Sequence, residues 1–193
     1  MTLSLPIDPE ANNLLQRDPL ALLIGMILDQ QFPLERAFAA PYELTKRLGH
    51  EPTARELADF DPEALTAIFA TPPALHRFPK AMAARVQEAC QILVGTYDGR
   101  AEKVWLDAAD GKDLLKRVGA LPGFGKQKAQ IFVALLGKRF DVRPEGWREA
   151  AGAYGPDDAY KSVADIIDPA SLVKVREYKQ AAKAAAKEAA AKK

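Results

Sequence analysis

Cysteine is almost absent from this sequence, since Cys90 is the only one in 193 residues. A single cysteine excludes internal disulfides, zinc sites built from several cysteines and any four-cysteine iron–sulfur cluster. We therefore expect no cofactor and a reducing compartment, the cytoplasm.

Long apolar runs are also missing. No stretch approaches the roughly 18 apolar residues needed to cross a bilayer. The N-terminal sequence MTLSLPIDPEANN lacks the basic segment and apolar core of a secretory signal. With 27% charged residues, we expect a soluble protein with no membrane partner, long enough for one domain or two small lobes.

The alternation of apolar and polar residues that marks a half-buried strand is a third absence. Apolar residues instead recur at helical spacing, between Ser, Thr or Asp cap signals and closing glycines. Helices are expected over 18–32, 33–49, 53–60, 61–70 and 79–99, as a helix-hairpin-helix over 110–138, and from 162 onward with a break at Pro169; 141–162 is expected to be loop. The predicted fold class is all-α.

The net charge of +1 conceals an uneven distribution. Residues 174–193 carry seven Lys or Arg against two Glu, and residues 112–143 carry eight against two Asp. Positive charge concentrated in this way indicates a polyanionic partner. The Ala/Lys-rich tail has high helix propensity but no apolar stripe. It is therefore either a DNA-binding arm that frays when free or a solubilising end.

The stretch LPGFGKQKAQ combines a tight turn with positive charge. Gly123 and Gly125 bracket one apolar residue and lead directly into a helix. Glycines let the backbone approach a partner closely, and the free N–H groups of a helix start stabilise an anion. Lys126 and Lys128 add charge beside these donors. The pattern predicts a seat for a DNA backbone phosphate, whereas the lack of a preceding strand and of Gly-Lys-Ser/Thr argues against a nucleotide P-loop.

Three segments together carry a family resemblance. They are DPLALLIGMILDQQ, LHRFPKAMAARVQEACQILVGTYDG and the hairpin LPGFG at 121–125, in this order along the chain. Their order and spacing resemble the HhH-GPD superfamily of base-excision DNA glycosylases, which includes endonuclease III and the adenine-DNA glycosylase. The resemblance covers roughly residues 15 to 140.

This resemblance implies a two-lobed helical fold that clamps double-stranded DNA through its backbone phosphates and flips a damaged base into a pocket. One glutamine would fill the gap left in the base stack. The DNA-binding positions, completed by three tail lysines from the charge pattern, are Gln30, Gln31, Lys80, Gly123, Phe124, Gly125, Lys126, Lys128, Lys179, Lys183 and Lys187. His76 and Arg77 lie at the bend before Lys80. No metal site is expected from side chains, and the resemblance leaves room only for a monovalent cation held by the hairpin main chain.

Catalysis is where the sequence departs from the family. The family's essential aspartate, counted from the hairpin, falls on Glu145, with Asp141 one helical turn earlier. Gln127 occupies the position of the Schiff-base lysine of the strand-cleaving members, and Gly25 that of the adenine glycosylase's glutamate. We therefore expect no lyase activity. Glu145 first and Asp141 second are candidates for a carboxylate that stabilises the sugar cation or activates water.

Two hypotheses about function remain open. The first is a monomeric, duplex-DNA-binding base-excision-repair protein, at best a monofunctional glycosylase or lesion-recognition protein. The second is a non-catalytic, nucleoid-associated or architectural DNA-binding protein on a degenerate glycosylase scaffold. Both place a helical domain at 1–173 and a basic tail at 174–193. Trp147 and Tyr154 would either stack a flipped base or pack the following loop onto the core.

Overall fold

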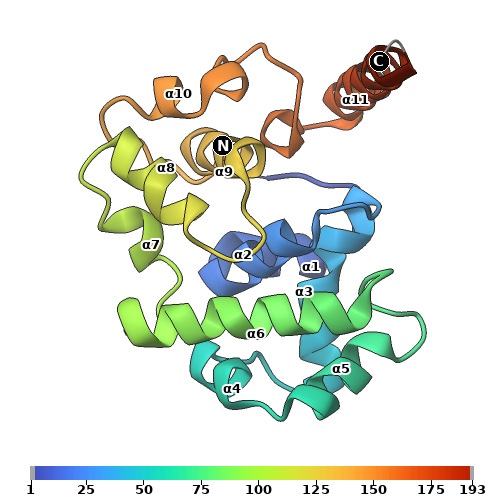
Figure 1. Cartoon of the computed structure of the whole chain (residues 1–193), viewed down its shortest axis with the longest axis vertical. Coiled ribbons are helices and arrows are strands. Elements are labelled where there is room, and N and C mark those ends of the chain that lie inside the picture. Colours follow the sequence, from blue (N-terminus) through green and yellow to red (C-terminus); the bar gives the residue numbers. More distant parts are fainter. Residues whose placement is uncertain (1–2, 192–193) are drawn as a thin grey trace.

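The computed structural model describes residues 3–191, which form helices and loops with no strand among them. None of the helices in this range combines the length and apolar character of a membrane span. The order of elements (Figure 1) is α1 (Pro9–Arg17), α2 (Pro19–Leu28), α3 (Leu34–Leu48), α4 (Ala54–Asp59), α5 (Pro62–Ala70), α6 (Pro79–Thr96), α7 (Lys103–Leu106), α8 (Gly111–Gly119), α9 (Lys126–Arg139), α10 (Trp147–Ala150), the 3-10 turns η1 (Gly152–Tyr154) and η2 (Val163–Asp165), and α11 (Pro169–Ala191).

The all-α prediction is confirmed, with several local differences. The predicted loop 141–162 contains α10 and η1, and the last α-helix begins at Pro169 rather than at 162. Helix α2 ends at Leu28 rather than continuing to residue 32, because the chain leaves helical geometry at Asp29 and turns left-handed at Gln31. Helices α1 and α7 were not predicted, although α1 has the same Asp–Pro start as α2. The tail, expected to fray, is a continuous helix to Ala191.

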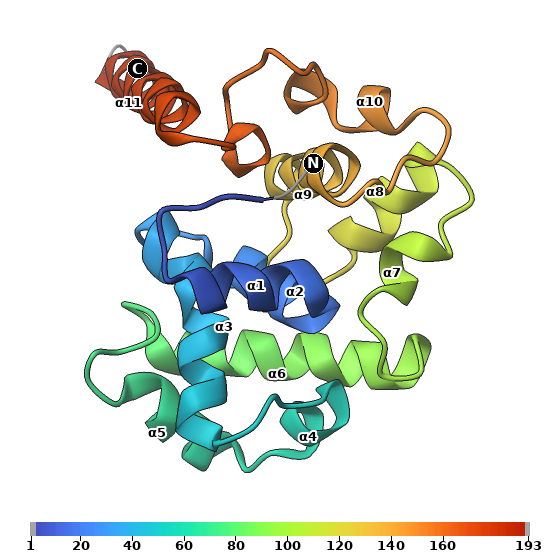
Figure 2. The ribbon, with the colours of Figure 1, turned by 180° about the vertical axis from the view of Figure 1, so that it is seen from behind.

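The helices form two groups joined along α2. Helix α6 has α4 and α5 on one side and α2 on the other, with α3 beside α2 and α5. The second group holds α8, α9, α10 and the two 3-10 turns. Figures 1 and 2 show the loop before α9 reaching from the second group toward α2, while α11 lies at an outer corner. The hairpin loop thus lies where the second group approaches the first.

Aromatic packing fixes the hairpin lobe from inside. Phe124 stacks on Phe132, with ring centroids 5.7 Å apart. Trp147 covers Gly137 so closely that a Cβ there would lie 2.3 Å from its ring. Both Trp147 and Tyr154 are buried. Of the two uses open to these aromatic residues, the structure supports packing of the loop onto the core.

A buried ion pair anchors the segment that leads into α11. Lys138 Nζ lies 2.5 Å from Asp165 Oδ1, with both side chains almost wholly buried. The same ammonium donates to the carbonyl of Pro156, and the other carboxylate oxygen of Asp165 accepts the main-chain N–H groups of Lys161 and Ser162. This network ties the loop after η1 to helix α9.

Removing one partner should reveal this anchor. We expect Asp165→Ala to lower the free energy of unfolding by about 3–5 kcal/mol, because it leaves the Lys138 ammonium buried without a counter-charge. Asp157→Ala is the matched control, since the Asp157–Arg148 pair is largely exposed and solvent screens it. Urea denaturation followed by circular dichroism measures both; equal losses would contradict the anchoring role.

Candidate nucleic-acid interface

The hairpin between α8 and α9 presents unpaired main-chain donors. Gly123 adopts a left-handed φ of 83°, which turns the chain into α9. No side chain caps α9, and the N–H groups of Gly125, Lys126 and Gln127 have no hydrogen-bond partner among residues 3–191. The N–H of Phe124, expected to face a phosphate, instead donates to Leu121 at 3.2 Å. Of the predicted phosphate donors, the Phe124 N–H is therefore used within the turn, and the unpaired N–H groups begin at Gly125. We call the N–H groups of Gly125, Lys126 and Gln127 the hairpin seat.

Open space surrounds this seat. A Cβ built on Gly125 meets no atom within 4 Å, and its φ of −76° and ψ of 174° suit any residue. Lys126 and Gln127 are exposed as well. The fold itself therefore does not require glycine at position 125. A ligand that approaches the three N–H groups, in contrast, would require the absence of a side chain there.

Arg85 connects the hairpin to the end of α2. A Cβ on Gly123 would lie 2.6 Å from Arg85 Cδ, so this side chain passes directly beneath the turn. Its Nη1 donates to Gln30 Oε1 at 2.8 Å. Sequence reasoning missed Arg85, because nothing local marks one arginine of the amphipathic helix α6 as special.

The two candidate glutamines occupy different environments. The Gln30 side chain is held by Arg85, and its carbonyl accepts from His76 Nε2 at 2.9 Å. Gln31 is exposed, with a left-handed φ of 51° that turns it out of the helix. Of the two glutamines, Gln31 is therefore the one whose side chain is exposed.

His76, considered near the DNA because of its position at the bend, is buried. Its Nδ1 accepts the N–H of Phe78 at 3.0 Å, so its Nε2 is the donor to Gln30. Burial lowers the pKa of His76, against the opposing effect of its main-chain hydrogen bonds. His76 thus fastens two loops together, while its neighbour Arg77 and the predicted contact Lys80 are exposed at the start of α6.

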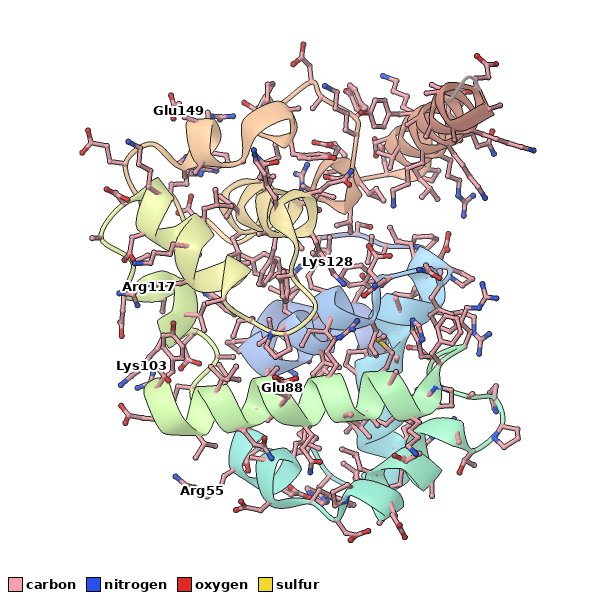
Figure 3. All side chains as sticks on the ribbon, viewed as in Figure 1. Arg55, Glu88, Lys103, Arg117, Lys128 and Glu149 are labelled. Atoms are coloured by element: carbon pink, nitrogen blue, oxygen red, sulfur yellow. The ribbon has the colours of Figure 1, made fainter. Side chains whose placement is uncertain are left out.

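Lys128 differs from the mobile surface charge that the sequence suggested. Its Nζ donates to the carbonyl of Ile27 at 2.8 Å and lies 5.6 Å from the ring centre of Phe124. Figure 3 shows it between the hairpin and α2. Burial lowers the pKa of Lys128 to about 8, although Asp29 opposes the shift.

An open cleft of about 540 Å³ brings the hairpin, the end of α2 and the tail helix together. Helix α11 forms one wall with Lys179 and Lys183. The lining residues are Met26, Asp29, Gln31, Phe32, Gln127, Lys128, Ile131, Lys179 and Lys183. We call this the hairpin cleft. The third tail lysine of the prediction, Lys187, is exposed further along α11 and does not line it.

The two carboxylates proposed for catalysis lie elsewhere. Glu145 is exposed and borders a separate cleft of about 480 Å³ with Asp110, Lys112, Gly146, Glu149 and Ala150. Asp141 is 82% exposed and lies 3.3 Å from Arg143. Figure 3 shows Glu149, a member of the separate cleft, well apart from Lys128. Neither Glu145 nor Asp141 lines the hairpin cleft.

Gln127 and Gly25 stand at the positions that the resemblance assigned to the Schiff-base lysine and to the glutamate acid, and the structure shows the surroundings of both. Gln127 Nε2 donates to the Tyr154 hydroxyl at 2.7 Å. A Cβ on Gly25 would lie 2.9 Å from Phe38 Cδ1, so a larger side chain has no room there. The two positions that the resemblance assigned to the lysine and the glutamate are thus occupied by an amide held by Tyr154 and by a glycine packed against Phe38.

A model of the HhH-GPD superfamily of base excision DNA repair proteins matches residues 24–137. The chain belongs to this superfamily. The matched range includes the end of α2, all of α6 and the hairpin, which are the segments that carried the resemblance. Membership implies DNA binding. No curated protein and no solved structure matches the chain.

The environment of Lys128 gives a measurable titration. We expect one lysine amine to titrate near pH 8 rather than at the ordinary value of 10.5, because burial disfavours its charged form. Nuclear magnetic resonance of the lysine side chains as a function of pH measures this, and Lys128→Met should remove the resonance. The absence of any lysine that titrates near 8 would contradict the buried position of the amine.

Proposed function

We propose that the protein binds duplex DNA in the hairpin cleft and recognises a damaged nucleotide there, without lyase activity. Any chemistry is that of a monofunctional glycosylase, which releases a base and leaves the strand intact. The observation that carries the proposal is the convergence on one cleft of the uncapped start of α9, the projecting Gln31 and the basic face of α11.

Each element has a defined task on DNA. The N–H groups of Gly125, Lys126 and Gln127 hold a backbone phosphate, assisted by the positive end of the helix dipole. Gln31 fills the space left in the base stack when a nucleotide turns out. Phe32, partly buried at the edge of the cleft, offers an aromatic face to a flipped base.

The tail helix supplies additional phosphate contacts. From Lys179 to Ala191 all of its residues are exposed, including the two lysines that line the cleft, Lys179 and Lys183. The ion pair of Arg176 with Glu35 holds the helix against α3, so Lys179 and Lys183 are carried at the cleft mouth. Because each neutralised phosphate releases counterions, binding should weaken steeply with salt.

The residue at the family's nucleophile position supports the absence of strand cleavage. An amide cannot form the imine on which lyase chemistry depends, and Gln127 is oriented by Tyr154. Lys128 is a nearby amine, but its Nζ is directed to Ile27. The same facts favour the alternative, a DNA-binding protein with no chemistry, since the family's catalytic side chains are replaced.

The hairpin seat can be tested without disturbing the fold. We expect Gly125→Ala to fold normally and to weaken binding to every duplex by about tenfold, because the methyl group keeps a phosphate from its charge-assisted hydrogen bonds. Gly95→Ala in α6 is the matched control, since its Cβ also meets no atom within 4 Å. Fluorescence anisotropy over a range of salt concentrations measures both variants.

Unchanged affinity in Gly125→Ala would remove the phosphate seat from the proposal.

The same preparations, mixed with an abasic duplex and borohydride, should form no covalent protein–DNA adduct. A trapped adduct would contradict the absence of a lyase nucleophile.

A further inference from the structure

We propose that Asp29 is the catalytic carboxylate of base release, acting from the α2 wall of the hairpin cleft; this inference rests on the proposed function. It replaces Glu145 and Asp141, which lie outside that cleft. It also makes the protein an enzyme with an active-site carboxylate contributed by the end of α2.

The position of Asp29 in the cleft is the first support. Asp29 is the only acidic residue among those that line the hairpin cleft. It also lines the neighbouring cleft between α3 and α11. It follows α2 directly and comes two residues before the exposed Gln31. A nucleotide turned out beside Gln31 would thus have its sugar close to this carboxylate.

The second support is that the carboxylate is unused by the fold. Most of the other acidic side chains either cap a helix, as Asp18 does, or form an ion pair with a basic side chain, as Asp157 does with Arg148. The Asp29 side chain accepts no hydrogen bond from any residue in the range 3–191, although it is only partly exposed. A carboxylate at the edge of a cleft that forms no hydrogen bond within the fold remains available to a ligand.

Charges around Asp29 come from three elements. Lys128 faces it from α9, Lys179 from α11 and Glu35 from α3. Burial raises the pKa of the Asp29 carboxyl, and the two lysines oppose that rise. On balance the pKa of Asp29 is raised, and the two lysines stabilise the negative charge that the carboxylate would present to a positively charged transition state.

The step is a hydrolysis. The bond between the sugar C1′ and the base nitrogen breaks, and its electron pair leaves with the base. The Asp29 carboxylate stabilises the positive charge that develops on the sugar and accepts a proton from a water molecule, whose oxygen forms the new bond to C1′. The departing base takes up a proton from solvent and Asp29 then releases its proton to solvent, so the net reaction consumes one water and gives a free base and an abasic site.

The test uses two abasic analogues, so it does not depend on knowing the base. One duplex carries a cationic pyrrolidine in place of the sugar, and the other a neutral tetrahydrofuran. The wild-type chain should bind the pyrrolidine duplex about tenfold more tightly, the effect of one charge-assisted contact. Asp29→Asn should lose this preference and still bind the tetrahydrofuran duplex.

Glu145→Gln is the matched control, because it removes an exposed carboxylate from the other cleft. It should keep the full preference. In parallel, duplexes with uracil, hypoxanthine, an alkylated purine or 8-oxoguanine are treated with alkali to reveal abasic sites. Base release by the wild-type chain should slow roughly a hundredfold or more in Asp29→Asn. Thermal melting verifies the fold, and Asp29→Ser serves as the second variant if Asp29→Asn is unstable.

The outcomes separate the two proposals. An equal pyrrolidine preference in Asp29→Asn, or its loss in Glu145→Gln alone, overturns the role of Asp29. So does the absence of base release by the wild-type chain on every duplex. In each of these cases, tight binding of the tetrahydrofuran duplex leaves the proposed function intact. Failure of the wild-type chain to bind any duplex overturns the proposed function itself.

Discussion

The hydrogen bond from Lys128 Nζ to the carbonyl of Ile27 holds the two walls of the hairpin cleft at a fixed spacing. The last carbonyls of any helix lack intrahelical partners, and a cation at that end is favoured by the helix dipole. Lys128 of α9 thus provides the hydrogen-bond donor for a carbonyl at the end of α2, 101 residues away in the sequence. Arg85 reinforces the same junction by passing beneath Gly123 to reach Gln30. Both contacts therefore place a basic side chain at this junction.

Within residues 3–191 this construction leaves particular groups unpaired, and the proposed DNA contacts use these groups. The core needs Phe124 and the turn needs Gly123, but the three N–H groups that follow have no use in the folded chain. Gln30 and His76 secure the α2–α3 connection, so Gln31 is released to solvent. The residues that stabilise the fold are therefore next to those proposed to bind the ligand. A substitution can thus change binding without changing stability.

Sequence reasoning succeeded where the determining interactions are local. The Asp–Pro start of α2, the closing Gly49 of α3 and the double glycine of the hairpin act within a few residues, so these two helices and the turn were predicted, whereas the same Asp–Pro signal at α1 was missed. It could not foresee that Lys128 is half-buried against Ile27, or that Lys179 faces Asp29, because those contacts join distant segments. Counting along the chain from the hairpin selected Glu145, but the loop after α9 turns toward α8, where the Gly111 N–H bonds the Glu145 carbonyl. A position defined by counting is reliable only while the chain follows a regular element.

Amide hydrogen exchange of the full-length protein, with and without a duplex containing a tetrahydrofuran abasic analogue, tests the location of the DNA most directly. The account predicts that protection on binding is concentrated in 29–35, 123–131 and the cleft-facing part of α11, with no change in 141–150. Protection concentrated around Glu145, with the hairpin unchanged, would contradict it.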